Sequence, residues 1–251
     1  KGYTDAYLVF SEKRFLDTAL KNANFILQKQ KQTDGGLNHS YKDGKTTING
    51  FLEDYSFTIE AFITLYEATF DMKWLNEAKD LMEYSINRFH DKNSAMFWFT
   101  SDLDKALIAR KMEVMDNVIP ASNSSIAKSL FTLGHYFNHN EYVEMSRQML
   151  NNVKNEIPQY GSGYSNWGVL MLYFVSRFYE VAIVGNSVDE KREEFSIHYL
   201  PNKIFVGSKT RSSLPLLENK FVEGETMIYV CENKSCKLPV TEVNDAVKLI
   251  H

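Results

Sequence analysis

Three segments of the chain carry apolar residues at helical spacing on one side only. In residues 12–29 the apolar positions from Leu16 to Leu27 recur every three or four residues, while lysines lie off that stripe. Residues 72–90 and 140–154 repeat the pattern. This periodicity predicts amphipathic helices, each of which buries one face and exposes the other.

Between these segments lie three others that are apolar on almost every side, over residues 51–70, 122–138 and 164–178. A helix that is apolar all round must be surrounded by protein. Alternation of the two kinds predicts an inner layer of helices wrapped by an outer one. A flat array of helical repeats is the competing arrangement.

The connections favour the layered arrangement. The passage from a buried to an amphipathic helix takes one or two residues, whereas the return passages over 30–50, 91–121 and 155–163 are long. This asymmetry places every long loop on one face of the molecule. Long loops held over a rigid scaffold are where functional sites are commonly built.

Each long loop also ends in a polar cluster at the start of a buried helix. These clusters are Glu53-Asp54-Tyr55, Ser122-Asn123-Ser124 and Ser162-Gly163-Tyr164-Ser165. Ser, Asn and Asp are good helix N-caps, so capping is one interpretation. Convergence of the three clusters on a common pocket is the other.

From about residue 179 the pattern changes to short β-rich runs, two of which end in glycine. We therefore divide the chain into a helical part, 1–178, and a small α/β extension, 179–251. The extension has expected strands over 180–185, 203–207 and 227–230 and expected helices over 187–198 and 241–250.

The charge and the apolar content of the chain argue against two classes of partner, nucleic acids and membranes. The net charge is −4 and there is no long basic run, which argues against nucleic acid as a partner. No apolar run is long enough to cross a bilayer, and the first residues do not resemble a signal peptide. A cytoplasmic protein fits best, although a processed or truncated chain would look the same.

The two cysteines, Cys231 and Cys236, are separated by four residues. Two cysteines exclude a disulfide framework, and their spacing differs from the Cys-x-x-Cys of redox pairs. A structural zinc site needs four ligands, and no second Cys or His pair follows. We expect a local contact or an incidental thiol pair, and we expect no metal and no cofactor.

Five stretches resemble the DUF255 family of thioredoxin-domain-containing proteins, in order and over nearly the whole chain: 50–55, 65–75, 116–124, 181–185 and 229–239. The resemblance implies a thioredoxin-like domain followed by an (α/α)6 toroid, similar to six-hairpin glycosidases and N-acylglucosamine 2-epimerases. The fold class implied for this chain is mainly α, a partial toroid with a small C-terminal α/β extension.

The chain departs from the family pattern in two ways. Glu53 and Ser56 stand where the family usually has Asp and Ala, and Ser122 stands where it has Gly, whereas Asp54 and Asn123 are kept. The thioredoxin-like domain and the first toroid helices are missing. We therefore expect a C-terminal fragment with exposed inner-helix flanks. Its expected partners are an upstream thioredoxin-like domain or a second copy.

Paired carboxylates can serve sugar chemistry as general acid and as base or nucleophile. The candidates on the long-loop face are Glu53, Asp54 and Asp116. Neighbouring helical side chains point about 100° apart, so Asp54 with Asp116 is a better catalytic pair than Glu53 with Asp54. Capping and loop hydrogen bonding is the alternative role.

An epimerase would need a histidine near the ring, and His39 is the histidine that is placed for the pocket. His90, His135 and His139 are expected at helix ends away from that face. Sugars also stack on aromatic rings and bond to amides and hydroxyls. The full set of substrate-binding candidates is His39, Tyr55, Trp98, Asn117, Ser122, Asn123, Ser124 and Tyr164.

These observations favour a domain that binds or processes a small carbohydrate-like ligand, with glycosidase or epimerase chemistry. The alternative is a non-catalytic module that supports the thioredoxin-like domain implied by the resemblance.

Overall fold

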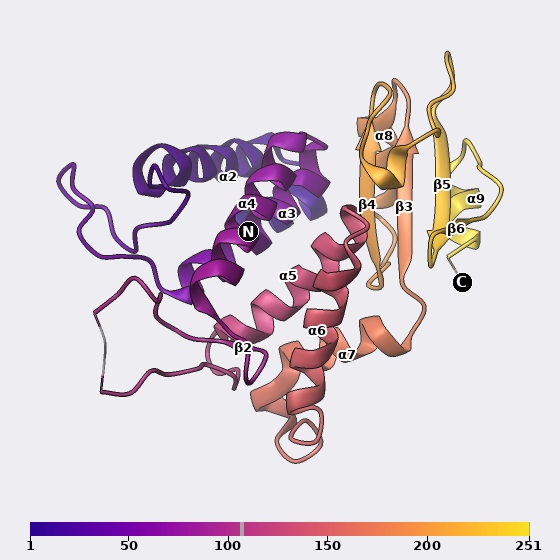
Figure 1. The fold of residues 1–251 in the computed structure, drawn as a ribbon. Coiled ribbons are helices and arrows are strands. Elements are labelled where there is room, and N and C mark those ends of the chain that lie inside the picture. Colours follow the sequence, from indigo (N-terminus) through magenta and orange to yellow (C-terminus); the bar gives the residue numbers. More distant parts are fainter. Residues whose placement is uncertain (106–107, 251) are drawn as a thin grey trace.

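The computed structural model describes residues 1–105 and 108–250 and contains two layers of helices (Figure 1). The inner helices are α1 (Gly2–Phe10), α3 (Leu52–Thr69), α5 (Ser122–Tyr136) and α7 (Ser165–Val175). Each contacts the next along an arc, and α2 (Lys13–Phe25), α4 (Met72–Phe89) and α6 (Asn140–Val153) pack outside them. The predicted alternation of wholly apolar and amphipathic helices therefore corresponds to the alternation of inner and outer helices along the chain.

Helix α3 shows how sequence sets the ends of an inner helix. The Asp54 carboxylate accepts the Phe51 backbone N–H at 2.8 Å, which satisfies a donor that the first turn leaves free. At the other end Phe70 adopts a left-handed conformation, φ 51°, and Asp71 then caps α4 by accepting the Lys73 N–H at 3.0 Å. The short passage from inner to outer helix is thus a single reversal of the chain.

Helices α5 and α6 approach closely at Gly134. A Cβ atom at this position would lie 2.6 Å from Cγ2 of Val143 and 3.2 Å from the His139 carbonyl oxygen. Glycine is required here because the two helices leave no room for a side chain.

The long loops contain structure that periodicity did not predict. A π-helical turn (Ile26–Gln30) ends the second helix, and a short hairpin of β1 (His90–Asp91) and β2 (Met96–Phe97) begins the second long loop. A 3-10 turn (Gly161–Tyr164) leads into α7. Such short elements lack a hydrophobic repeat and leave little trace in sequence.

The extension holds a four-stranded sheet in the order β4-β3-β5-β6. Strands β3 (Tyr179–Val184) and β4 (Lys203–Ser208) are parallel and joined by α8 (Val188–Phe195), as the expected β-α-β unit requires. Strands β5 (Met227–Glu232) and β6 (Ser235–Cys236) run antiparallel, and α9 (Val243–Lys248) follows.

Alternate side chains of β3 face two different cores. Ala182 and Val184 belong to the core shared with the helical layers, whereas Val181 and Ile183 pack with α8 and α9. Because side chains alternate across a strand, the sheet is covered on both faces, by the helical arc on one side and its own helices on the other (Figure 1). The extension is thereby packed onto the body through its sheet.

One expectation about the inner helices is wrong in detail. Helix α7 is apolar all round, yet Leu172 is 53% and Val175 is 72% exposed. At the opposite end of the arc, Val9 and Phe10 of α1 are also exposed. Among the described residues no further helix packs beyond α1 or α7, the two ends of the arc, so these flanks meet solvent.

The cysteine expectation also needs correction, because Cys231 and Cys236 form a disulfide. They face each other across the β5–β6 hairpin, whose turn uses left-handed conformations at Asn233 and Lys234. Four intervening residues are enough for a tight hairpin to bring two side chains into register. Spacing alone did not reveal this because it carries no information on the turn.

None of the described helices is long and apolar enough to span a bilayer.

Candidate ligand site on the long-loop face

The long-loop face is formed by residues 30–50, 91–121 and 155–163 together with the starts of α3, α5 and α7. Glu53 lies in the first turn of α3 on this face and is half-buried. Among the described residues, no hydrogen bond or ion pair reaches its carboxylate. Burial raises its pKa above the ordinary value, and the neighbouring carboxylates Asp54 and Glu113 add to the rise. Glu53 is therefore a half-buried carboxylate without a hydrogen-bond partner among the described residues.

Asp54 is held differently. Besides capping α3, its carboxylate lies 2.9 Å from Nδ1 of His39, whose ring packs against Phe51 with centroids 4.9 Å apart. The structure thus brings together His39 and Asp54, which lie 15 residues apart in sequence. The pair joins the first long loop to the start of α3, and the side chain of His39 remains 37% exposed.

Two cavities meet at Glu53. The first, of about 350 Å³, has Gln30, Asn38, Asp54 and Phe57 in its lining. Glu53 and Asp54 both line it, so neighbouring positions in the first turn of α3 reach one cavity despite their angular separation.

The second cavity, of about 550 Å³, is lined by the segment before α5, including Lys111, Glu113 and Asn117, and by Tyr164. Ile119 and Glu53 border both cavities. A ligand with several hydroxyl groups in the second cavity would be near the carboxylate of Glu53, the amide of Asn117 and the ammonium group of Lys111. Ile119 adds apolar surface beside them.

Asp116 takes part in a different arrangement. Its buried carboxylate accepts the Ala121 N–H at 2.9 Å, the Ser124 hydroxyl at 2.7 Å and the Asn166 N–H at 2.9 Å. These three donors hold the starts of α5 and α7 together. Asp54 lies in the first turn of α3 and caps that helix, whereas Asp116 lies in the second long loop and holds the starts of α5 and α7; the predicted catalytic pairing of the two remains a prediction.

Asn123 and its neighbours are also buried. The Asn123 side chain accepts the Phe97 N–H at 2.8 Å and donates to the Phe97 and Glu113 carbonyl oxygens, both at 2.9 Å. Ser122 lies 3.5 Å from the Glu113 carboxylate. The second polar cluster therefore fastens the loop to the first turn of α5, although the N-cap itself is Ala121 and, among the described residues, no side chain caps this helix.

The predicted aromatic contacts differ in how accessible they are. The Tyr55 hydroxyl accepts the Leu37 N–H at 2.7 Å, and its ring is fully buried against Tyr84. Burial raises the pKa of Tyr55 well above its ordinary value. Trp98 is half-buried beneath the guanidinium of Arg110, 4.9 Å from its ring centroid. Among all the predicted substrate-binding residues, Asn117 is the exposed one beside the second cavity.

Sequence reasoning missed Gln30, Lys111 and Glu113. Gln30 ends the π-helical turn, and its side chain donates to the Asn38 carbonyl oxygen at 3.2 Å, so this turn places it at the first cavity. Lys111 and Glu113 form an ion pair at 2.8 Å. An acid and a base two residues apart in a loop look like ordinary surface charges, so no sequence signal separated them.

Within residues 1–105 and 108–250, no three His, Cys, Asp or Glu side chains are grouped to hold a metal ion. The groups that the described residues offer on this face are carboxylates, amides, an ammonium group and the imidazole of His39.

No protein-family model matches the chain. Human spermatogenesis-associated protein 20 is 24% identical over 271 residues, which cover 100% of this chain and 34% of that protein. The chain is homologous to spermatogenesis-associated protein 20. Its rat counterpart is 25% identical over 80% of the chain, and an uncharacterized Caenorhabditis elegans protein is 23% identical over 100%. The DUF255 resemblance is thereby confirmed.

The chain spans about a third of the length of human spermatogenesis-associated protein 20. Its fold is similar to that of a GH76 α-mannanase from Bacteroides thetaiotaomicron, with a TM-score of 0.53 and 14% sequence identity. The likeness covers 85% of this chain and 61% of the mannanase. The partial (α/α)6 toroid expected from the sequence is therefore confirmed as the fold of the helical layers.

Proposed function

We propose that the helical arc binds a carbohydrate-like ligand on the long-loop face, with Glu53 as its central polar contact. The observation that carries the proposal is the half-buried Glu53 carboxylate, which borders two cavities and has a raised pKa. A carboxylate held in this way accepts hydrogen bonds from ligand hydroxyl groups more strongly than one in open water.

The surroundings suit a sugar. Asn117 offers an exposed amide group, which both donates and accepts, while Phe57 and Ile119 offer apolar surface; the amides of Gln30 and Asn38 are held in place by bonds to each other's carbonyl oxygens. A pyranose ring presents hydroxyl groups at its edge and C–H groups on its faces, so it can use both kinds of contact. The fold shared with a mannanase supports this choice of ligand class by analogy alone.

Processing of the ligand would need a second group. A raised pKa suits Glu53 to the role of general acid, because it keeps a proton to higher pH. Asp54 and Glu113 are the nearby carboxylates for the role of base or nucleophile, and the His39–Asp54 pair would serve an epimerase. Asp116 is assigned the role of positioning α5 rather than of reacting.

The alternative function is a non-catalytic module that supports other parts of a longer protein. The specific observation in its favour is that Asp116, Asn123 and Ser124 are engaged in contacts within the protein. The upstream thioredoxin-like domain, or a second copy meeting the exposed flanks of α1 and α7, would then be the partner.

Isothermal titration of the chain with mannose, N-acetylglucosamine and manno-oligosaccharides separates the two functions. We expect at least one sugar to bind and Glu53→Gln to weaken it by roughly tenfold, the size expected when a charged hydrogen bond is lost. Glu83→Gln, on the outer helix α4, is the matched control and should bind as the parent does. Absence of binding by every sugar would support the scaffold, whereas equal binding by Glu53→Gln would show that Glu53 is not the central contact.

A further inference from the structure

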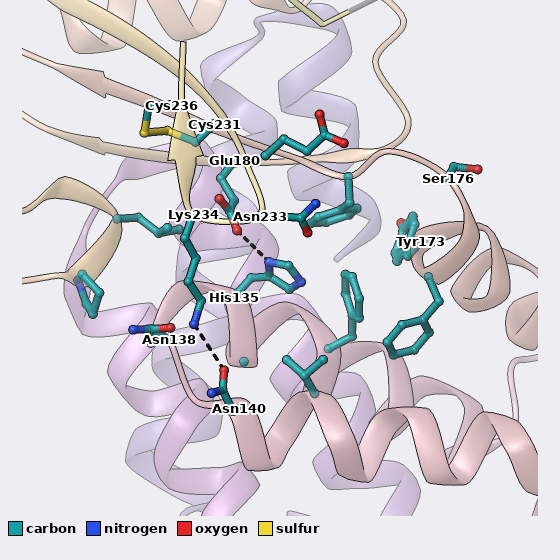
Figure 2. A pocket seen from close by; sticks show the side chains of 18 of the residues that line it. His135, Asn138, Asn140, Tyr173, Ser176, Glu180, Cys231, Asn233, Lys234 and Cys236 are labelled. Atoms are coloured by element: carbon teal, nitrogen blue, oxygen red, sulfur yellow. Dashed lines mark hydrogen bonds and ion pairs between the residues drawn. A yellow bond between two sulfur atoms is a disulfide. The ribbon is translucent and has the colours of Figure 1, made fainter.

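A separate cavity of about 440 Å³ lies where the helical arc meets the sheet (Figure 2). Helices α5, α6 and α7 form one side of it, and β3 and the β5–β6 hairpin form the other. It is distinct from the long-loop face, which lies at the opposite ends of the inner helices. A volume of this size accommodates a small molecule.

The cavity contains a buried carboxylate with an unused oxygen. Glu180 lies on β3 and is 2% exposed, and its Oε1 is 2.8 Å from Nδ1 of His135 on α5. Its Oε2 is buried and has no hydrogen-bond partner among the residues that the structure describes. A buried acceptor without a donor is costly, so a ligand that supplies an N–H group there would be stabilised.

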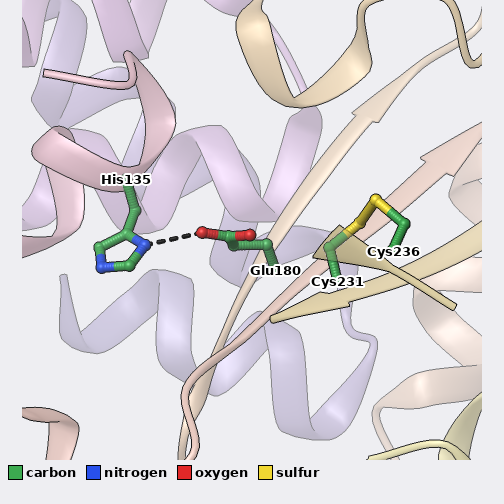
Figure 3. The surroundings of a disulfide bond; sticks show 4 residues. All are labelled: His135, Glu180, Cys231 and Cys236. Atoms are coloured by element: carbon green, nitrogen blue, oxygen red, sulfur yellow. Dashed lines mark hydrogen bonds and ion pairs between the residues drawn. A yellow bond between two sulfur atoms is a disulfide. The ribbon is translucent and has the colours of Figure 1, made fainter. Parts of the chain in front are cut away.

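Neighbouring side chains fix where that carboxylate points. Glu180 faces Cys231 across the β3–β5 pair, and the Cys231–Cys236 disulfide lies on the same side of the sheet (Figure 3). The imidazole of His135 packs against Phe131 and Phe178, with ring centroids 4.5 and 5.1 Å away. Both partners of the His135–Glu180 contact are therefore held by packing before any ligand binds.

One wall of the cavity is aromatic. Phe131 lies at its centre and contacts the rings of Tyr173, Phe174 and Phe178 at centroid distances of 5.6, 4.9 and 4.8 Å. These rings come from α5, α7 and the segment before β3, and all four line the cavity. They offer an apolar side chain a surface from which water is excluded.

Cationic groups lie elsewhere in the lining. Lys220 is half-buried, and no ion pair reaches it within the described part of the chain. Burial lowers its pKa, and the charge of Glu180 opposes that change. The guanidinium of Arg147 lies 4.4 Å from the Phe174 ring centroid, and Lys234 donates to Asn140 at 3.3 Å. The cavity thus holds an acceptor for a cation and donors for an anion.

We propose that this cavity binds a free α-amino acid with an apolar side chain. The ammonium group would donate to Oε2 of Glu180, the carboxylate would meet Lys220 and Arg147, and the side chain would lie on the aromatic wall. A zwitterion fits better than a simple cation or anion, because the lining carries both signs of charge around one apolar surface. The inference does not depend on a sugar binding the long-loop face.

Titration with L-phenylalanine and L-leucine tests the proposal directly. We expect at least one of them to bind and to raise the Tm, while N-acetyl-L-phenylalanine and L-phenylalaninamide bind at least about tenfold more weakly, because each lacks one of the two charges. Equal binding of the charged and blocked forms, or absence of binding by both amino acids, would overturn it.

Variants locate the site. Glu180→Gln and Lys220→Met should each weaken amino acid binding by roughly tenfold or more. Glu242→Gln, which removes an exposed carboxylate paired with Lys191 at the start of α9, is the control and should bind as the parent does. Circular dichroism establishes that each variant is folded. If Glu180→Gln does not fold, Lys220→Met and the two blocked ligands decide, and unchanged binding by Lys220→Met counts against the proposal.

Discussion

The Glu67 carboxylate accepts the Tyr136 hydroxyl at 3.0 Å, although the two residues lie 69 positions apart on α3 and α5. The same carboxylate oxygen accepts the Phe205 backbone N–H at 3.0 Å, and the Tyr136 hydroxyl lies 2.8 Å from the Phe205 carbonyl oxygen. Phe205 belongs to β4, the edge strand of the sheet. Two side chains of the helical layers thus form hydrogen bonds with the N–H and C=O groups that an edge strand leaves unpaired. These bonds hold the extension against the arc.

This arrangement predicts that Tyr136→Phe destabilises the chain. Tyr136 is fully buried, so removing its hydroxyl leaves an acceptor on β4 without a donor. We expect the free energy of unfolding to fall by about 1–3 kcal/mol, measured by urea denaturation. Tyr199→Phe, at an exposed position, should leave it unchanged. A parent-like midpoint for Tyr136→Phe would show that the contact does not hold the sheet.

Gly134→Ala is expected to be destabilising despite the better helix propensity of alanine. The added Cβ would lie 2.6 Å from Cγ2 of Val143, so α5 and α6 must move apart, at a cost of about 1–3 kcal/mol. Gly168→Ala in α7 is the matched control, because a Cβ at that position would have no described atom within 4 Å and propensity should make the change neutral or slightly stabilising. Thermal unfolding of the two variants compares them, and a similar Tm for both would contradict the packing argument.

Asn123 and Asn117 should separate structural from ligand-binding roles on the long-loop face. Asn123→Ala removes three hydrogen bonds between α5 and the second long loop, so we expect the free energy of unfolding to fall by about 2–4 kcal/mol. Asn117→Ala, at an exposed position, should leave stability within about 0.5 kcal/mol of the parent and weaken sugar binding. Stability is measured by denaturation and sugar binding by titration. If Asn123 were a ligand contact alone, Asn123→Ala would lose sugar binding and keep the stability of the parent.

Glu53 gives the folding stability a defined dependence on pH. Its pKa is raised in the folded state above the ordinary value of 4.5, so folding favours the protonated form. The penalty is absent below the unfolded pKa and grows as the pH rises through the folded one. We expect the parent to lose stability relative to Glu53→Gln as the pH rises above about 4.5, the ordinary value of this group. Parallel free-energy profiles of the two proteins would contradict a raised pKa.

Much of this fold could be predicted because hydrophobic periodicity reports burial. Helices α3 and α5 are apolar on almost every side beyond their first turns, and both lie between other elements as that pattern requires. Helix α7 carries the same pattern but has an exposed flank, since periodicity cannot tell whether a neighbouring helix exists.

The candidate site was less predictable, because polar residues at helix starts have two possible roles. Asp54 and Asp116 look alike in sequence, and both hold helix starts, whereas the Glu53 carboxylate has no such contact among the described residues. His135 was expected at a helix end away from the long-loop face, and the structure adds that it contacts Glu180 there. That contact joins residues 45 positions apart, beyond the reach of local spacing.

Reduction of the Cys231–Cys236 disulfide should destabilise the chain only modestly. The bond closes a short loop within a hairpin that backbone pairing already holds, so the loop-closure entropy that it removes from the unfolded chain is small. We expect the free energy of unfolding to fall by at most about 2 kcal/mol when a reductant is added, measured by urea denaturation. The double variant Cys231→Ser with Cys236→Ser should not respond to the reductant. A much larger loss in the parent alone would mean that the disulfide holds more than its own hairpin, including the packing of β5 against Glu180 and the helical arc.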